Sequence, residues 1–321
     1  MKFQKIAFLA MIAMLAATPV MAQELLFEDD FTDGSRFTEE EIDGYTLLQP
    51  SFDFDGYDPF FDHFFLVESL TGAGTSENPE SNDDTTGLQV FVNTGGFESP
   101  YNVDGINFVT DEEFSGNIRV TIDVWLNYSF GGTTEFFGLG IFQSGDYLMN
   151  VNQLFEDDVL GVGGDGYFFS MNGDGDSGST LGDFIFSEYT PDTFLTETIA
   201  CGEWITEPTE DCTYDVSSTE RETASPALQE LFPEEGAALL GSPGNRWVRV
   251  VMEHIDGTIN VYLNGELFHT YTDEDRTYSS GHVTIAYEDV FGSNGEGRQW
   301  LGVDYLSVEQ LDTNVSRWSL Y

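Results

Sequence analysis

A strict alternation of apolar and polar side chains is the feature that most limits how this chain folds. From Ile118 to Leu126 every second residue is a branched aliphatic one, and the residues between them include Arg119 and Asp123. A period of two is that of a β-strand with one face in a core, because successive side chains point to opposite faces. The segment therefore predicts a strand that is buried on one side.

Two dipeptides further along predict tight hairpins. Asp256-Gly257 and Asn264-Gly265 separate three apolar runs between residues 247 and 272. Such dipeptides supply the positive φ values that two-residue hairpin turns need, so an antiparallel meander of three strands is expected. The other strand candidates are 26–31, 88–93, 106–109, 136–142, 167–171, 184–187, 283–287 and 303–308.

These strands predict an all-β protein. About eleven short strands separated by Gly, Asp and Asn turns are typical of two packed antiparallel sheets. One helix is expected, beginning at Pro226 after the capping residue Ser225 and reaching Leu240 at most, inside an insertion of about 191–245. Neither an internal repeat nor a Pro-rich linker is present, so a single domain is expected over 23–311, with a tail at 312–321.

The first 22 residues predict a signal peptide. Lys2 and Lys5 precede an apolar run at 6–17, and Val20 and Ala22 supply small residues for cleavage after Ala22. A membrane anchor is the alternative, but it needs about 20 apolar residues, so no membrane span is expected. The expected location is extracellular or periplasmic.

The charge of the chain excludes one class of function. The 299 residues after Ala22 hold 58 acidic residues, eight arginines and no lysine, a net charge of −50. Such a surface repels phosphate, so a nucleic-acid binder is excluded. Self-repulsion of this size indicates a saline, halophilic habitat or one rich in divalent cations. The alternative is that the acidity only keeps an exported, Phe-rich chain in solution.

Cys201 and Cys212 are the two cysteines of the chain. Two thiols cannot form a four-thiolate zinc site. In an exported protein, a local disulfide between Cys201 and Cys212 is the favoured prediction, and it would close a loop of the insertion.

A family resemblance rests on the C-terminal strands. The strand that begins Trp247-Val-Arg-Val-Val and the hairpin Val261-Tyr-Leu-Asn-Gly265 resemble the late strands of the concanavalin A-like lectin/glucanase superfamily, in particular its laminin-G-like domains. The resemblance implies a two-sheet jelly-roll β-sandwich in which the opening strand near Phe27 pairs with a closing strand at 303–308. It implies no single function, because this fold carries binding modules, enzymes and structural modules alike.

The hydrolases of that superfamily resemble one another in a strand with the spacing Glu-x-Asp-x-x-Glu, which presents an acid and a nucleophile on one face. This spacing is absent here, and Glu41-x-Asp43 lacks the later Glu. The leading hypothesis is therefore a non-catalytic carbohydrate-binding or cell-surface/matrix module. The alternatives are a glycoside hydrolase whose carboxylates come from distant segments, and a structural or adhesive protein bridged by divalent cations.

One loop has the composition of a calcium site. Asn172, Asp174 and Asp176 alternate with Gly, and Asp183 stands at the twelfth place counted from Asn172. Calcium takes six to eight oxygen ligands, and such a loop can wrap around the ion. The pattern resembles an EF-hand loop but has Ser177 where that family has Gly, and Asp183 where Glu is usual. The alternative is an acidic turn between strands.

Trp125 and Tyr128 are the candidate ligand-binding residues. They fall on the polar side or at the end of the strand that begins at Ile118. An exposed aromatic ring on a sheet face can stack on a sugar ring, with a glycan as the partner. The alternative is that Trp125 is covered by the insertion and serves packing.

Overall fold

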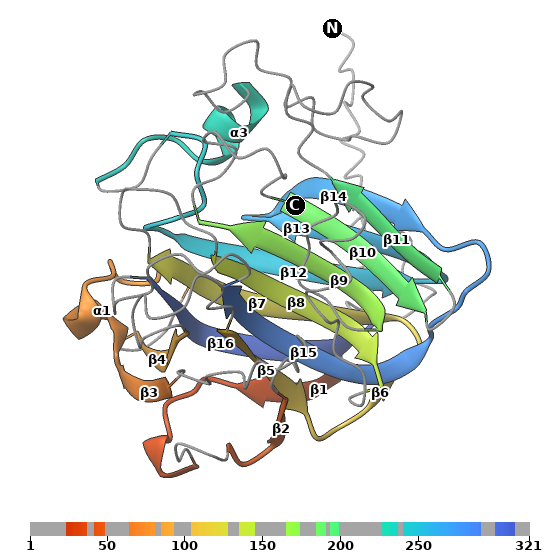
Figure 1. Ribbon diagram of the computed structural model, residues 1–321, viewed down its shortest axis with the longest axis horizontal. Helices are drawn as coiled ribbons and strands as arrows, with labels where there is room; N and C mark the ends of the chain where they lie inside the picture. Colours follow the sequence, from red (N-terminus) through yellow and green to blue (C-terminus); the bar gives the residue numbers. More distant parts are fainter. Residues whose placement is uncertain are drawn as a thin grey trace, which may run out of the picture.

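The computed structural model describes residues 24–36, 42–48, 64–80, 85–92, 104–127, 135–144, 165–173, 184–190, 193–198, 226–236, 240–289 and 299–311. They form two antiparallel sheets that face each other (Figure 1). Sheet A contains β1 (Glu24–Asp29), β3 (Phe64–Ser69), β4 (Thr86–Phe91), β7 (Ile118–Asn127), β12 (Trp247–Ile255), β13 (Thr258–Leu263), β14 (Glu266–Thr272) and β16 (Trp300–Gln310). Sheet B contains β2 (Tyr45–Leu48), β5 (Asp104–Thr110), β6 (Phe114–Ser115), β8 (Glu135–Gln143), β9 (Gly166–Asn172), β10 (Phe184–Thr190), β11 (Thr193–Thr198) and β15 (Ser280–Asp289).

The strand order confirms the jelly-roll β-sandwich. Sheet A runs β14-β13-β12-β7-β16-β4-β3, with β1 also paired to β16, and sheet B runs β11-β10-β9-β8-β15-β5-β2, with β6 paired to β15. The expected pairing of the opening and closing strands is present, since Glu28 lies opposite Ser307 and Asp29 opposite Leu306. Chain segments far apart in sequence are thereby brought into one sheet.

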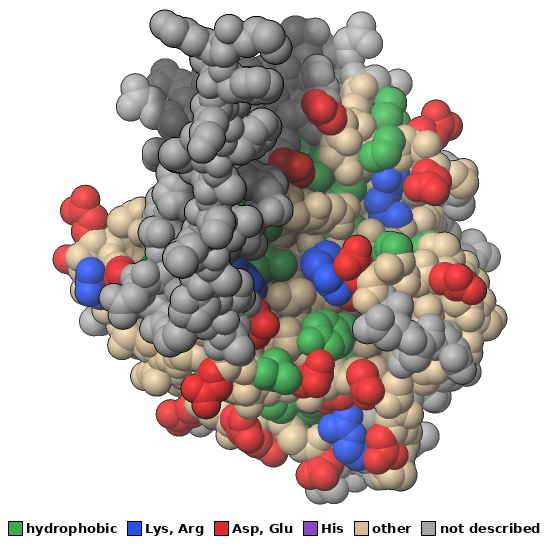
Figure 2. Space-filling view, turned by 180° about the vertical axis from the view of Figure 1, so that it is seen from behind, with side chains coloured by type: hydrophobic (Ala, Val, Ile, Leu, Met, Phe, Trp, Pro, Cys, Tyr) green, Lys and Arg blue, Asp and Glu red, His purple; other side chains and the backbone are tan. Residues whose placement is uncertain are grey.

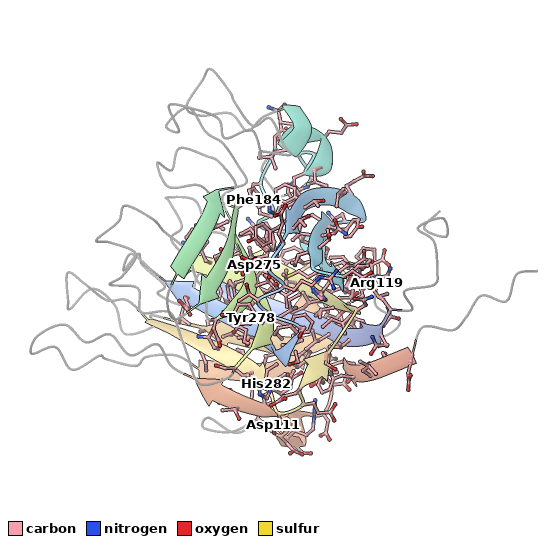
Figure 3. All side chains as sticks on the ribbon, turned by 90° about the vertical axis from the view of Figure 1, so that its right-hand side faces the viewer. Asp111, Arg119, Phe184, Asp275, Tyr278 and His282 are labelled. Atoms are coloured by element: carbon pink, nitrogen blue, oxygen red, sulfur yellow. The ribbon has the colours of Figure 1, made fainter. Side chains whose placement is uncertain are left out.

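Alternation along the strands explains the core. The five aliphatic residues between Ile118 and Leu126 are at most 3% exposed and pack against the inner face of sheet B. Seen from the side, the side chains of the two inner faces fill the space between the sheets (Figure 3). Because β-strands alternate, each sheet also has an outer face that points away from this core. These two outer faces are where polar side chains gather.

The predicted meander is confirmed. Strands β12, β13 and β14 are neighbours in sequence order. The turn residues have the required backbone angles, with φ of 53° and 89° at Asp256 and Gly257 and of 51° and 86° at Asn264 and Gly265. Positive φ at both central positions is the condition for a type I′ turn.

The structure confirms one expectation about elements and corrects another. The helix α3 (Pro226–Leu231) begins at the predicted residue and ends within the predicted limit of Leu240, because Pro233 disfavours helical angles at the residue before it and Gly236 has φ of 59°. Four strands were not predicted, namely β2, β3, β6 and β11. The short helices η1 (Gly34–Arg36) and α1 (Leu70–Ala73) complete the described elements.

Several predictions concern residues outside the described part. They are the signal peptide at 1–22, the disulfide between Cys201 and Cys212, and the site residues Tyr128, Asp174, Asp176 and Asp183. Within the described ranges, no helix has both the length and the apolar character that a membrane crossing needs.

Candidate functional site

Five adjacent strands of sheet B, in the order β5-β15-β8-β9-β10, present a regular grid of outward-facing residues. In one row Thr284 lies between Val109 and Gly140, and the row continues to Phe168 and Ser187. With strands spaced about 4.8 Å apart, a row spans roughly 19 Å. The outer face of sheet B consists of Gly105, Asn107, Val109, Phe136, Gly138, Gly140, Phe168, Ser170, Asn172, Ile185, Ser187, Thr284, Ala286 and Glu288.

Two glycines of β8 let larger side chains lie across the centre of this face. A Cβ at Gly138 would lie 2.3 Å from Cε1 of Phe168, and a Cβ at Gly140 would lie 2.3 Å from Nε2 of Gln143. Both distances are too short for any other residue type to fit without movement. The Phe168 ring and the Gln143 amide therefore lie directly over the backbone of β8.

Three polar groups on or beside this face have hydrogen-bonding capacity to spare. Ser170 Oγ, Thr284 Oγ1 and Gln143 Nε2 have no hydrogen-bond partner among the described residues, and the three residues are at most 2% exposed. A buried polar group without a partner costs about 1–3 kcal/mol, so native proteins seldom leave one without a reason. Three of them on neighbouring strands make this face the candidate site for a polar ligand.

The charge on this face is confined to one side chain in the described part of the chain. Glu288 is 4% exposed, and its Oε1 accepts a hydrogen bond of 3.0 Å from Nδ2 of Asn107. Its methylene groups cover Gly105, where a Cβ would lie 2.4 Å from Cγ of Glu288. The outward residues of β9 are Phe168, Ser170 and Asn172, so this strand presents no carboxylate. The described face thus offers one carboxylate where a glycosidase needs two.

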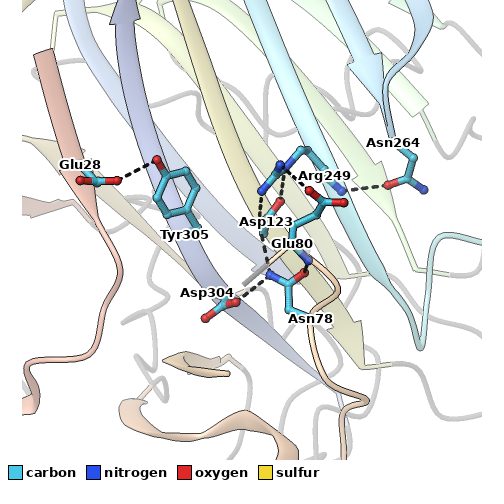
Figure 4. Close-up of polar contacts among 8 residues, drawn as sticks. All are labelled: Glu28, Asn78, Glu80, Asp123, Arg249, Asn264, Asp304 and Tyr305. Atoms are coloured by element: carbon cyan, nitrogen blue, oxygen red, sulfur yellow. Dashed lines mark hydrogen bonds and ion pairs between the residues drawn. The ribbon is translucent and has the colours of Figure 1, made fainter. Parts of the chain in front are cut away.

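The outer face of sheet A is organised in the opposite way. Asp123 on β7 accepts two hydrogen bonds from Arg249 on β12, at 2.7 and 2.6 Å (Figure 4). Asn78 Nδ2 reaches both Asp304 Oδ2 at 2.6 Å and Asp123 Oδ2 at 3.2 Å. The hydrogen bond with Asp123 raises the pKa of Arg249, against the opposing effect of burial. The buried charges here already have partners within the protein.

A second ion pair on the same face follows the same rule. Arg119 contacts Glu253 at 2.6 Å and Glu309 at 3.5 Å, and the Tyr262 hydroxyl donates to Glu253 at 3.2 Å. On the side of the molecule opposite to the view of Figure 1, basic side chains are few and lie next to acidic ones (Figure 2). The arginines of sheet A therefore serve the fold.

Trp125 lies on this outer face of sheet A. Its side chain is 6% exposed, so the expectation of an open ring is wrong. The burial agrees with the alternative, in which the ring is covered and serves packing. The ring packs edge-on against Trp247 at 5.9 Å between centroids. It belongs to a cluster of Leu70, Phe91, Trp125, Trp247 and Trp300. A sugar-binding role for Trp125 stays a prediction, as does that of Tyr128, which lies outside the described residues.

Of the predicted calcium ligands, the structure places Asn172. It is the last residue of β9, is buried, and belongs to the outer face of sheet B. Because Met171 pairs with Phe184, β9 and β10 close a hairpin whose loop begins just after Asn172 and ends at Asp183. Among the described residues, no three His, Cys, Asp or Glu side chains are arranged to hold a metal ion. Asn172 thus ends a strand of the candidate face, and the other three predicted ligands follow it in the sequence that joins β9 to β10.

Sequence reasoning missed the outer face of sheet B. Its members come from five strands between Gly105 and Glu288, and they become neighbours only through strand register. One signal was available: Gly138 and Gly140 alternate inside an apolar strand. Glycine inside a strand often marks the close approach of another group, and here that group is Phe168.

Comparison with known proteins finds likeness in fold. No family model matches the chain, and no curated protein sequence does either. A cellulose-induced protein, Cip1, has a TM-score of 0.45 at 13% identity, over 88% of this chain and 96% of its own. A glycoside hydrolase family 16 endo-glucanase from Bacteroides ovatus has a TM-score of 0.42 at 11% identity, over 88% of this chain and 100% of its own. The carbohydrate binding module CBM66 from Bacillus subtilis has a TM-score of 0.33 at 10% identity, over 70% of this chain and 86% of its own. At these identities the likeness describes the jelly-roll sandwich alone.

Proposed function

We propose that this protein is a secreted, non-catalytic carbohydrate-binding module whose ligand lies on the outer face of sheet B. The observation that carries the proposal is the set of three buried polar groups without partners in the described structure, Gln143 Nε2, Ser170 Oγ and Thr284 Oγ1. They lie on or beside three adjacent strands, so a ligand that reaches this buried face would meet all of them.

The chemistry of the face favours a sugar. A sugar hydroxyl both donates and accepts hydrogen bonds, and so do the hydroxyls of Ser170 and Thr284, while the Gln143 amide nitrogen donates. Small-molecule sites combine an apolar surface with a few placed polar groups. Here Phe168 and Ala286 supply apolar surface next to those groups. A hydroxyl-rich ring with apolar C–H faces matches both features.

The carboxylates of the described face support binding without hydrolysis. The two-carboxylate mechanism needs an acid and a second carboxylate on the same face, and the described face has Glu288 alone. The alternative function, glycoside hydrolysis, predicts that reducing ends appear when the protein is incubated with its polysaccharide. The binding-module proposal predicts none.

Calcium enters the proposal through the β9–β10 loop. Asn172, Asp174, Asp176 and Asp183 would supply oxygen ligands at the end of the hairpin that carries Ser170 and Ser187. A filled loop would stabilise that hairpin and thereby the candidate face. We expect Asp174→Asn with Asp176→Asn to abolish calcium-induced thermal stabilisation. Export is tested separately, by sequencing the N-terminus of secreted protein for cleavage after Ala22.

The direct test is co-sedimentation of the purified protein with insoluble β-glucan, xylan, chitin and mannan, in high salt with calcium. Selective depletion by one polysaccharide is the expected result. Ser170→Ala and Thr284→Val should then weaken binding by about tenfold each, which corresponds to about 1.4 kcal/mol.

Two matched variants serve as controls. Thr121→Val and Ser307→Ala make the same chemical changes on the outer face of sheet A, where the two residues lie opposite each other. Both should bind like the unmodified protein. Equal losses in all four variants would show a general effect on the fold, and no depletion by any polysaccharide would refute the proposal.

A further inference from the structure

We infer that residues 74–80 form a displaceable strap that seals a tryptophan cluster on the outer face of sheet A, and that the Asn78 side chain holds the strap closed. The strap follows α1 in the connection from β3 to β4, and it contains neither a helix nor a strand. Its first residue, Gly74, has φ of 115°, a backbone conformation that glycine adopts at no steric cost. The inference concerns sheet A alone and does not depend on the proposed function.

The surface beneath the strap is aromatic and belongs to the centre of the sheet. Trp125 on β7 lies opposite Trp247 on β12 and opposite Gly302 on β16. A Cβ on Gly302 would lie 3.2 Å from Cζ3 of Trp300, so the ring of Trp300 lies against this glycine. The three tryptophans are 4–9% exposed, and their strands are paired on both sides. Strand pairing therefore fixes the positions of the three tryptophans without help from the strap.

Asn78 joins the strap to two of these strands at once (Figure 4). Its Nδ2 lies 2.6 Å from Oδ2 of Asp304 on β16 and 3.2 Å from Oδ2 of Asp123 on β7. A primary amide has two N–H donors, so each buried carboxylate receives one of them. Hydrogen bonds to a charged acceptor are roughly twice as strong as neutral ones. The same amide also stands between two like charges that would otherwise repel each other.

Two further contacts tie the strap to β12. The backbone carbonyl of Ser76 accepts a hydrogen bond from Nε1 of Trp247 at 2.9 Å. Glu80 contacts Arg249 at 3.0 Å, but the Glu80 side chain is 54% exposed. Exposed ion pairs contribute little to stability because water and salt screen them. Asn78 therefore makes the strongest attachment of the strap.

The closed strap also carries a cost. Thr75 Oγ1 and Trp125 Nε1 have no hydrogen-bond partner among the described residues, although both residues are more than nine-tenths buried. Thr85 has φ of 56°, which a residue with a side chain rarely adopts, and its Oγ1 accepts a hydrogen bond of 3.2 Å from the Asn78 backbone N–H. Opening the strap returns the two unsatisfied groups to water and frees Thr85 from this bond. The balance between closed and open strap thus depends on the contacts of Asn78.

The first experiment is native-state hydrogen exchange on the full chain, read at the Thr75 and Asn78 amides and at the amides of β7. In the closed strap the Thr75 N–H donates to the Leu70 carbonyl at 3.1 Å. We expect Thr75 and Asn78 to exchange at least about 100-fold faster than β7, at a rate that low urea concentrations leave unchanged, because a local opening exposes little surface. Exchange of the strap and of β7 at one rate, with one urea dependence, would overturn the inference.

A variant tests whether Asn78 holds the strap and whether the strap seals the tryptophans. Asn78→Asp removes both donors and adds a third carboxylate beside the two buried ones, so the strap should open. Trp204→Phe and Trp318→Phe in the background leave the three indoles of the cluster as the tryptophans of the chain. We expect the acrylamide quenching constant to rise at least about threefold and Thr75 exchange at least about tenfold, with β7 exchange unchanged.

Asn264→Asp is the matched control. The Oδ1 of Asn264 accepts a hydrogen bond from the Arg249 backbone N–H at 3.0 Å, and a carboxylate can accept the same bond, so quenching and exchange should keep the values of the unmodified protein. Faster exchange in Asn78→Asp without greater quenching would show that the strap does not seal the cluster. Unchanged exchange would show that Asn78 does not hold the strap. If Asn78→Asp does not fold, Asn78→Ala removes the donors without adding a charge and takes its place.

Discussion

The two outer faces of the sandwich use polar residues for different purposes. On sheet A, Arg119 and Arg249 are each matched to a buried carboxylate, and Asn78 bridges Asp123 and Asp304. On sheet B, Ser170 and Thr284 are buried with no partner in the described structure. The arginines of sheet A have partners within the protein, while the Trp125 indole nitrogen on that face has none in the described structure; on sheet B the two hydroxyls keep hydrogen-bonding capacity that the fold itself does not use.

This difference separates stability from function. Removing one partner of an ion pair on sheet A should leave the other buried charge uncompensated and weaken the fold. Removing a hydroxyl from sheet B should raise the free energy of unfolding of the ligand-free protein and weaken only ligand binding. Proteins commonly sacrifice stability at functional sites. Four experiments test this contrast.

The largest expected effect is on sheet A. Arg249→Leu leaves the buried carboxylate of Asp123 without its cation, so we expect a loss of about 3 kcal/mol in the free energy of unfolding. Urea denaturation at fixed salt measures it. The control is Arg276→Leu, which removes the same charge from an exposed position and should change stability by less than about 0.5 kcal/mol. Equal losses would show that overall charge, and not the buried pair, stabilises this face.

A smaller loss is expected from crowding the centre of sheet B. Gly138→Ala places a Cβ 2.3 Å from the Phe168 ring, and such overpacking should cost about 2 kcal/mol. The control is Gly72→Ala in α1, where the nearest atoms lie 3.6 Å away. A neutral Gly138→Ala would mean that Phe168 moves freely, and the face would then be less ordered than its glycines indicate.

The third effect has the opposite sign. Thr284→Val removes a buried hydroxyl without a described partner, so the ligand-free protein should gain about 1 kcal/mol in the free energy of unfolding. Thr121→Val on sheet A should change it by less than about 0.5 kcal/mol. Thermal unfolding without glycan measures both. A loss in Thr284→Val would show that its hydroxyl is satisfied in the free protein, and the contrast between the faces would fail at that position.

The smallest expected effect is a pH dependence of the free energy of unfolding that comes from a core residue. It sharpens the contrast because it determines the pH at which the other tests should be made. Burial lowers the pKa of His254, outweighing the hydrogen bond between Nδ1 and the Gly116 carbonyl at 2.8 Å. The folded state therefore favours the neutral ring, and its contribution to stability is complete above about pH 6.5 and declines as the pH falls.

We expect His254→Gln to flatten the stability curve between pH 6.5 and 5 by less than about 1 kcal/mol. His282→Gln alters another ring that contacts a backbone carbonyl, at 2.6 Å from Thr110 O, and it is measured alongside for comparison. An unchanged slope in His254→Gln would assign the pH dependence to other groups. The comparison of the two faces is then best made above pH 7.

The fold was more predictable than the site because its signals are local. The alternation in β7 and the turns at Gly257 and Gly265 each lie within one short segment, and all were confirmed. The segment Tyr167-Phe-Phe-Ser-Met171 shows why the site was missed. Its inward residues are aromatic or apolar and its outward residues are Phe168 and Ser170, so polarity with period two does not mark the outer face. Thr284 and Ser170 are likewise separated by more than 100 positions, and only the pairing of β15, β8 and β9 relates them.

The pairing of β1 with β16 determines how late in synthesis the folding of sheet A can be completed. Glu24 meets Gln310 and Asp29 meets Leu306, so the first described strand has no partner until the last one has left the ribosome. Contacts of such long range slow folding and leave an unpaired strand edge open to a neighbouring chain. The mutual repulsion of chains with so many carboxylates would then protect the partly folded molecule, as well as the folded one, from association with a neighbouring chain.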